Sequence, residues 1–188
     1  MSENAAGLNR EQWHEKLARI GEELSRRGAT ASLTVMGSAP GILAGQPSRT
    51  SMDLDVWRPA SDFDRTTFKA AVEATGLLYD PKGYEPAAPY IQMVEPGIVQ
   101  LGRFEPQLVE HYGGLTISKA PAANLIASKL LRASEVDLYD IAWMVGAYQP
   151  DLLDIGRAIQ SFPREPRERA TENMVYLQAL RASSDARG

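Results

Sequence analysis

Apolar residues follow a helical period near both ends of the chain and a strand-like alternation in its middle. Four apolar residues recur at helical spacing over 9–27, where Asn9 and Gln12 have the spacing of a capping box. The other predicted strands lie over 31–36, 89–94, 97–104 and 115–117, and one more ends at Trp57. The other predicted helices lie around Ile42 and over 62–75, 121–132, 135–147, 151–160 and 167–181.

Three of these elements carry further expectations. The strands over 89–94 and 97–104 flank Glu95-Pro96-Gly97, which predicts a hairpin. In the helix over 135–147 an apolar stripe is expected to face the core: Leu138, Ile141, Ala142 and Val145.

The order of the elements predicts an α/β fold, α+β in its layers, in which a small mixed β-sheet is flanked by helices. We expect an α/β core over 9–119. A helical C-terminal region over 120–182 is expected to pack on that core.

The composition sets limits on the function. The chain has 188 residues, of which 44% are hydrophobic and 23% charged, as in a globular protein. No apolar run approaches the ~18–20 residues that span a bilayer, so a cytoplasmic location and no membrane partner are expected. The net charge of −4 argues against a nucleic-acid binder that uses its whole surface, although a local basic face is compatible with it. The absence of cysteine excludes disulfides and thiolate metal sites.

Two aspartates alternate with apolar residues in the strand that ends at Trp57. Side chains two positions apart on a strand point to the same side, so Asp53 and Asp55 are expected on one face and Leu54 and Val56 on the other. Paired carboxylates suit Mg²⁺, which proteins bind through one or two carboxylates together with substrate phosphates. The pair therefore indicates phosphoryl chemistry.

Small and basic residues around this strand fit the same chemistry. Gly37-Ser38 follows a strand and precedes a short helix, a place where a phosphate can approach backbone N–H groups. The alternative is a simple turn with Ser38 as the helix cap. Arg49 either binds a phosphate in bidentate fashion or neutralises Asp53 at the surface.

These residues carry a resemblance to a known family. The stretch VMGSAPGILAGQPSRTSMDLDVW resembles the nucleotidyltransferase superfamily signature, in which Gly-Ser is followed by a helix and then by Asp-x-Asp. RTSMDLDV is similar to the form found in the abortive-infection and toxin–antitoxin branch. A second block, APAANLIASKLLRASEVDLYDIAWMV, is similar to the later segment of those proteins.

The resemblance implies roles for individual residues. Asp53 and Asp55 would hold Mg²⁺ or Mn²⁺, and Lys129 and Asp140 would join them as catalytic residues. The residues expected to bind the NTP are Gly37, Ser38, Arg49, Ser51, Lys129 and Arg132. The implied acceptor is a transfer-RNA end or a partner protein, in a toxin–antitoxin or phage-defence system with a cognate toxin or antitoxin chain.

The second block also has local explanations. Lys129 and Arg132 share one side of a helix, which is either a phosphate contact or a solvated basic face. Ser134 and Asp137 have capping-box spacing, so Asp137 has a structural explanation that Asp140 lacks.

One expected residue type is missing. Polymerase-type sites use a third carboxylate on a neighbouring strand, and the strand predicted over 97–104 carries Gln100, which cannot act as a base. The sequence therefore predicts a metal-dependent nucleotidyltransferase that moves NMP from an NTP to an RNA end or a protein hydroxyl. The alternatives are an inactive nucleotidyltransferase-like binding module, such as an antitoxin or a regulatory subunit, and an α/β domain with an incidental Asp-Leu-Asp.

Overall fold

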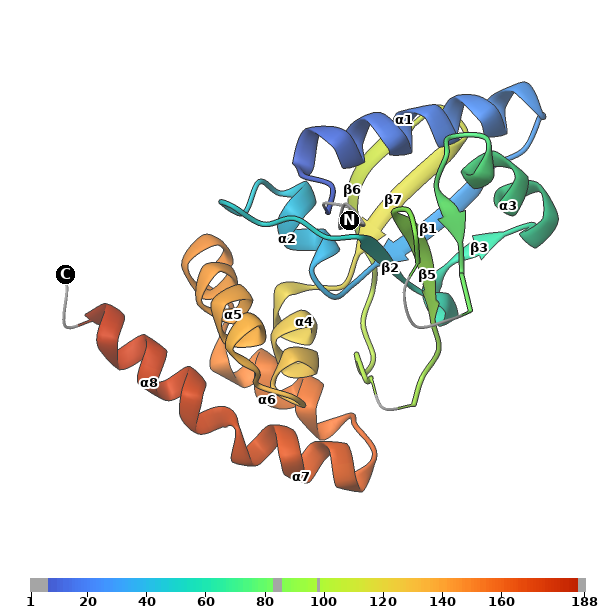
Figure 1. Cartoon of the computed structure of the whole chain (residues 1–188). Helices are drawn as coiled ribbons and strands as arrows, with labels where there is room; N and C mark the ends of the chain where they lie inside the picture. The colour runs from blue at the N-terminus through green and yellow to red at the C-terminus, as the bar shows by residue number, and fades with distance from the viewer. Residues whose placement is uncertain (1–6, 83–85, 98, 186–188) are drawn as a thin grey trace. The chain divides into compact units, whose positions relative to one another are not determined.

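The computed structural model describes residues 7–82, 86–97 and 99–185 (Figure 1). It divides into two compact units, each described here by itself. The sheet unit comprises Met1–Glu95 and Pro106–Lys119, and the helical unit comprises Pro96–Glu105 and Ala120–Gly188. The segment 96–105 belongs to the helical unit.

The sheet unit is built around one mixed, seven-stranded sheet with the order β4-β5-β2-β1-β7-β6, in which β3 pairs with β1. Parallel pairs join β4 to β5, β5 to β2 and β1 to β7, whereas β1 and β2, β1 and β3, and β6 and β7 are antiparallel. Its elements are α1 (Arg10–Arg26), β1 (Ala31–Val35), α2 (Ala39–Leu43), β2 (Asp53–Trp57), η1 (Arg58–Ala60), β3 (Asp62–Phe63), α3 (Arg65–Glu73), β4 (Leu78–Tyr79), β5 (Tyr90–Val94), β6 (Gln107–Tyr112) and β7 (Leu115–Lys119).

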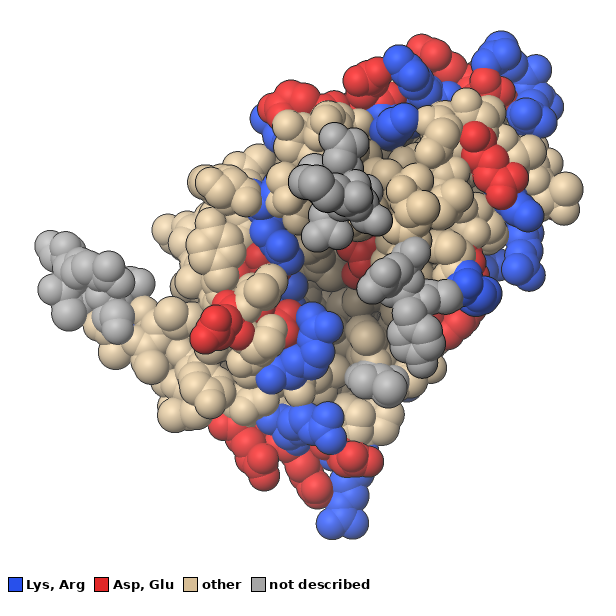
Figure 2. All heavy atoms as spheres, in the orientation of Figure 1, with Lys and Arg blue, Asp and Glu red and all other residues tan. Residues whose placement is uncertain are grey.

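Helices α1 and α3 supply the apolar layer that covers one face of this sheet. Asn9 and Gln12 form the predicted capping box at the start of α1. The helix then buries Trp13, Leu17, Ile20 and Leu24 against the sheet. Acidic and basic side chains alternate along its outer face (Figure 2). The apolar stripe predicted from the helical period is therefore confirmed.

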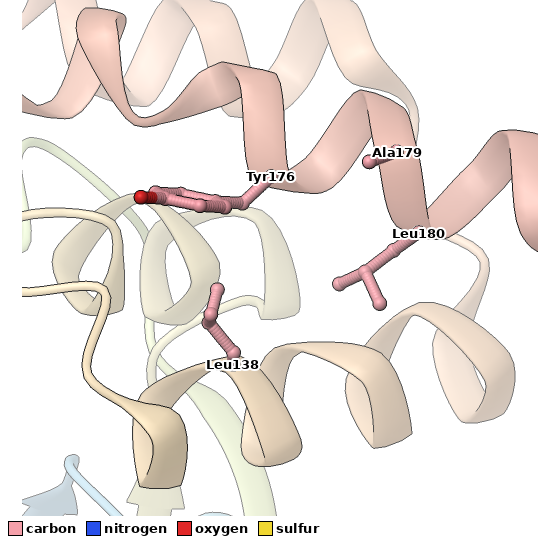
Figure 3. Close-up of a pocket in the computed structure, with 4 residues that line it drawn as sticks. All are labelled: Leu138, Tyr176, Ala179 and Leu180. Atoms are coloured by element: carbon pink, nitrogen blue, oxygen red, sulfur yellow. The ribbon is translucent and has the colours of Figure 1, made fainter.

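The helical unit contains five helices in its described part: α4 (Ala122–Lys129), α5 (Glu135–Tyr148), α6 (Leu152–Gln160), α7 (Arg164–Glu172) and α8 (Met174–Asp185). Leu138 of α5 faces Tyr176, Ala179 and Leu180 of α8 across a small apolar cavity (Figure 3). Within the described residues, no helix is both long enough and apolar enough to cross a membrane.

The predicted fold class, a mixed sheet flanked by helices, is confirmed, whereas two predicted elements and the hairpin are wrong. The described residues of 97–104 form no strand, so the hairpin does not exist. The strand that follows β5 is β6, over Gln107–Tyr112. The single helix expected over 167–181 is two helices, since α7 ends at Glu172 and α8 begins at Met174.

The predicted core stripe of α5 is displaced. Its buried residues are Asp137, Asp140, Ile141 and Met144, whereas Ala142 is exposed. The cause is that two aspartates occupy the inward face, so the apolar residues alone do not mark it.

Candidate functional site

Strand β2 presents two carboxylates on one face of the sheet. Leu54 and Val56 are 1% and 0% exposed and belong to the core, whereas Asp53 and Asp55, which alternate with them, are half-buried. The alternation read from the sequence is confirmed. The two carboxylates are two positions apart on the same strand, which is within reach of a single cation.

The Gly37 turn lies directly against the second carboxylate. The Met36 N–H donates to the Asp55 carbonyl over 2.9 Å. Gly37 has a φ of +64°, and a Cβ at this residue would lie 2.3 Å from Asp55 Oδ2. Only glycine therefore combines this backbone conformation with room for the carboxylate.

The residues that flank the carboxylates are held by local contacts. Ser38 is the N-cap residue of α2, but its side chain makes no capping hydrogen bond. Ser51 donates its hydroxyl to Asp53 Oδ1. Arg49 is half-buried, and its guanidinium donates to the Thr50 carbonyl over 3.4 Å. Ser51 thus fixes the orientation of Asp53, since a bonded carboxylate oxygen has fewer alternative positions.

The neighbouring strand places two residues beside the carboxylates that the sequence pattern did not identify. In the parallel register of β2 and β5, Tyr90 lies opposite Asp53 and Gln92 lies opposite Asp55. Burial raises the pKa of Tyr90, and the negative charges of Asp53 and Asp55 raise it further. Gln92 donates its amide to Asp80 Oδ1 over 2.9 Å.

This register corrects the position expected for a third carboxylate. Gln100 lies in the helical unit, where its amide donates to the Gly97 carbonyl over 2.7 Å. The residue beside Asp55 on the adjoining strand is Gln92. It is also a glutamine, so the side chain at that place is a hydrogen-bonding group that takes up no proton.

The donor set on β2 fits a small divalent cation. Two half-buried carboxylates converge on one face, and the missing Cβ of Gly37 leaves space at Asp55 Oδ2. The described residues contain no cluster of three or more histidine, cysteine or acidic side chains suited to a metal. A cation held here would therefore complete its coordination with water and substrate phosphate oxygens, as Mg²⁺ commonly does.

In the helical unit, the residues expected to act on the NTP form a buried ionic network. Lys129 is 7% exposed, and its Nζ lies 2.7 Å from Asp140 Oδ2 and 3.5 Å from Asp137 Oδ1. Arg132 donates to both Asp137 oxygens over 2.8 and 3.1 Å, while most of its side chain is exposed. Ser134 and Asp137 form the expected capping box.

The electrostatics of Asp137 follow from these contacts. Burial alone would raise the pKa of this carboxyl, but hydrogen bonds from Arg132 and Ser134 and the charge of Lys129 outweigh it and lower the pKa. Two cations and two carboxylates balance within the network, which is how buried charges are tolerated.

Comparison with known proteins supports the fold. No model of a protein family matches the chain, and no curated protein matches it. Among solved structures, the chain resembles the crystal structure of an antigenic nucleotidyltransferase-like protein from Paracoccidioides brasiliensis. The two share 14% identity with a TM-score of 0.54, and the match covers 95% of this chain and 94% of that one. The chain therefore has a nucleotidyltransferase-like α/β fold.

Proposed function

We propose that this protein is a metal-dependent nucleotidyltransferase that moves NMP from an NTP to a hydroxyl or phosphate-end acceptor. The observation that carries the proposal is the pairing of Asp53 and Asp55 on one face of β2 with a glycine turn packed against Asp55. The nucleotidyltransferase-like fold supports the same reading.

The roles of the residues follow from their positions. Asp53 and Asp55 would hold Mg²⁺ or Mn²⁺, and Ser51 would keep Asp53 oriented. The Gly37-Ser38 turn would receive the β- and γ-phosphates, with Arg49 nearby in sequence as a further positive charge. A bound cation would neutralise charge on the phosphates of the NTP during transfer.

The reaction forms a bond from the acceptor oxygen to the α-phosphorus and breaks the bond from that phosphorus to the bridging oxygen, so pyrophosphate leaves. The acceptor proton must pass to a base or to solvent. Gln92, the residue beside Asp55, cannot take it. The chain's own contribution is therefore positioning and charge neutralisation, which account for most catalysis in this class of reaction.

The expectations for the helical unit come from the sequence resemblance alone. It assigns Lys129 and Arg132 to NTP binding and Lys129 and Asp140 to catalysis, and within this unit Lys129 and Asp140 form a 2.7 Å ion pair. A toxin–antitoxin or phage-defence setting, with a transfer-RNA end or a partner protein as acceptor, follows from the sequence resemblance alone.

A second function is favoured by one observation. Because Gln92 occupies the place where a third carboxylate would lie, the protein is also suited to bind an NTP without transferring it. An antitoxin or a regulatory subunit would act in this way.

The test is incubation with each α-³²P-labelled NTP, Mg²⁺ or Mn²⁺, total RNA and cell extract. The matched control is the Asp53→Asn/Asp55→Asn variant, which keeps the size of both side chains. Label in RNA or protein that depends on the aspartates supports transfer and reveals the acceptor class. Metal-dependent NTP binding without label supports the binding module. A Gln92→Glu variant that gains label transfer would place the missing base at this residue.

A further inference from the structure

One pocket of the sheet unit has its apolar side on the sheet face opposite the β2 carboxylates, while its Asp80 accepts a hydrogen bond from Gln92, the residue beside Asp55. Its cavity measures about 340 Å³, within the ~300–1,000 Å³ usual for ligand pockets. Met93 lines it and pairs in register with Val56, a core residue that alternates with Asp55. The residues that line the pocket are Arg58, Phe63, Arg65, Tyr79, Asp80, Lys82, Met93 and Glu95.

Both arginines of this pocket have neutral neighbours. The Arg58 guanidinium carbon lies 4.8 Å from the centre of the Phe63 ring, and its Nη1 donates to the Ser61 carbonyl over 2.7 Å. Arg65 interacts with the hydroxyl of Tyr79. Among the described residues, neither guanidinium lies within ion-pair distance of a carboxylate. Their positive charges therefore lie beside neutral groups and are not neutralised by an ion pair.

The acidic residues of the pocket do not cancel this charge. Asp80 already accepts hydrogen bonds from Lys82, over 2.9 Å, and from Gln92. Glu95 is exposed at the rim. Burial raises the pKa of Tyr79, the charge of Arg65 opposes that rise, the charge of Asp80 adds to it and the charge of Arg58 also opposes it, so all three charges lie near its hydroxyl. With Lys82, the pocket has three cations against two carboxylates.

The apolar side of the pocket is suited to a planar group. Phe63, Tyr79 and Met93 pack against the main core. Phe63 and Tyr79 are joined through Phe68, with ring centres 4.7 and 5.9 Å apart. Arg58 stacked on Phe63 adds a flat guanidinium, a surface on which nucleobases also stack.

We propose that this pocket binds a nucleotide unit, with its phosphate at Arg58 and Arg65 and its base against the aromatic side. The chemistry is shared by single-stranded RNA and by a free mononucleotide. The proposal does not depend on catalysis at Asp53 and Asp55, because neither aspartate is among the residues that line the pocket, and Met93 in its lining lies on the other face of the sheet.

The experiment measures binding of two probes to the full chain carrying Asp53→Asn/Asp55→Asn, in EDTA, so that the carboxylate site does not contribute. Fluorescein-labelled octauridylate is titrated by anisotropy, and AMP by calorimetry. Arg58→Gln/Arg65→Gln removes both charges. Lys69→Gln is the control, because Lys69 lies one turn beyond Arg65 on α3, outside the pocket, and its loss removes one positive charge where the arginine variant removes two.

We expect the Arg58→Gln/Arg65→Gln variant to lose about tenfold or more in affinity, and Lys69→Gln less than about twofold. For octauridylate the slope of log K against log[salt] should fall by about 0.7, the value for one phosphate of a single strand. Arg58→Lys/Arg65→Lys keeps the charge and should retain most of the affinity, which separates charge from misfolding.

The two probes distinguish the source of the ligand. Binding of octauridylate but not AMP identifies a strand of RNA, and equal binding of AMP identifies a free nucleotide. The proposal is overturned if neither probe binds, or if the arginine variant and the Lys69 control lose the same affinity.

Discussion

Replacing Gly37 by alanine tests the geometry of the candidate metal site directly. Gly37 has a φ of +64°, and an added Cβ would lie 2.3 Å from Asp55 Oδ2. Gly28 is a matched control, because its φ is +62° and no atom lies within 4 Å of the added Cβ. Both glycines belong to the sheet unit, so the two substitutions report on the same part of the molecule.

The structure separates two energetic contributions. An alanine in the left-handed region costs about 1–2 kcal/mol at either position. Only Gly37→Ala must also displace the Asp55 carboxylate, by about 1 Å. Forcing that side chain off its rotamer costs about 0.5–1.5 kcal/mol, so Gly37→Ala should be the more destabilising variant. Moving a metal ligand in this way should also lower Mn²⁺ affinity about tenfold or more.

Urea unfolding followed by circular dichroism gives both free energies, and calorimetry gives the Mn²⁺ affinity. In an Asp55→Ala background the excess cost of Gly37→Ala over Gly28→Ala should disappear, because the clashing oxygen is gone. The reasoning is refuted if Gly37→Ala costs no more than Gly28→Ala, or if the excess survives the loss of Asp55.

Three further predictions concern charged and buried groups. Lys129→Met should destabilise the protein by about 3 kcal/mol in urea unfolding, since it leaves buried carboxylates without their cation, and Lys129→Met/Asp140→Leu should cost less. The pKa of Asp137 is lowered in the folded protein, so the stability that its carboxylate contributes is complete above pH 3.8, its ordinary pKa, and is lost as the pH falls through the lower folded pKa. Because Arg132 helps to lower that pKa, the Arg132→Gln variant should begin to unfold in acid at a higher pH than the unsubstituted protein. Burial raises the pKa of Tyr112 to about 12 from 10.0. The stability that its neutral hydroxyl contributes is therefore complete below pH 10 and is lost as the pH rises toward 12. Absorbance titration at alkaline pH should show this raised pKa.

Local hydrophobic patterns correctly predicted the helices and strands that bury one side and expose polar residues on the other. The Asn9 capping box and the apolar stripe of α1 are contained within one helix. The same holds for β2, where Asp53 and Asp55 alternate with buried Leu54 and Val56. Each of these features depends on residues a few positions apart, which is the range over which hydrophobic periodicity carries information.

The sequence predictions are wrong where packing between distant segments determines the structure. Strand β6 is a sheet edge whose side chains are mostly exposed, so its sequence has no apolar alternation. The apolar run over 97–104 looked more like a strand, but its buried Leu101 is held within the helical unit, where its carbonyl accepts from Asn124 over 2.8 Å. In α5 the inward aspartates are stabilised by Lys129, which lies on another helix.

The residue beside Asp55 shows why the candidate site could be predicted only in part. Its identity is set by the parallel register of β2 and β5, and that register is fixed by the core, because Ile91 is fully buried opposite Leu54. A shift of one residue would turn Ile91 toward the polar face, so the apolar packing energy holds Gln92 beside Asp55. The paired carboxylates of the candidate site thus follow from a local pattern, whereas the glutamine beside them follows from long-range pairing. The proposed nucleotide transfer and the alternative, nucleotide binding without transfer, therefore differ in what they require of residue 92.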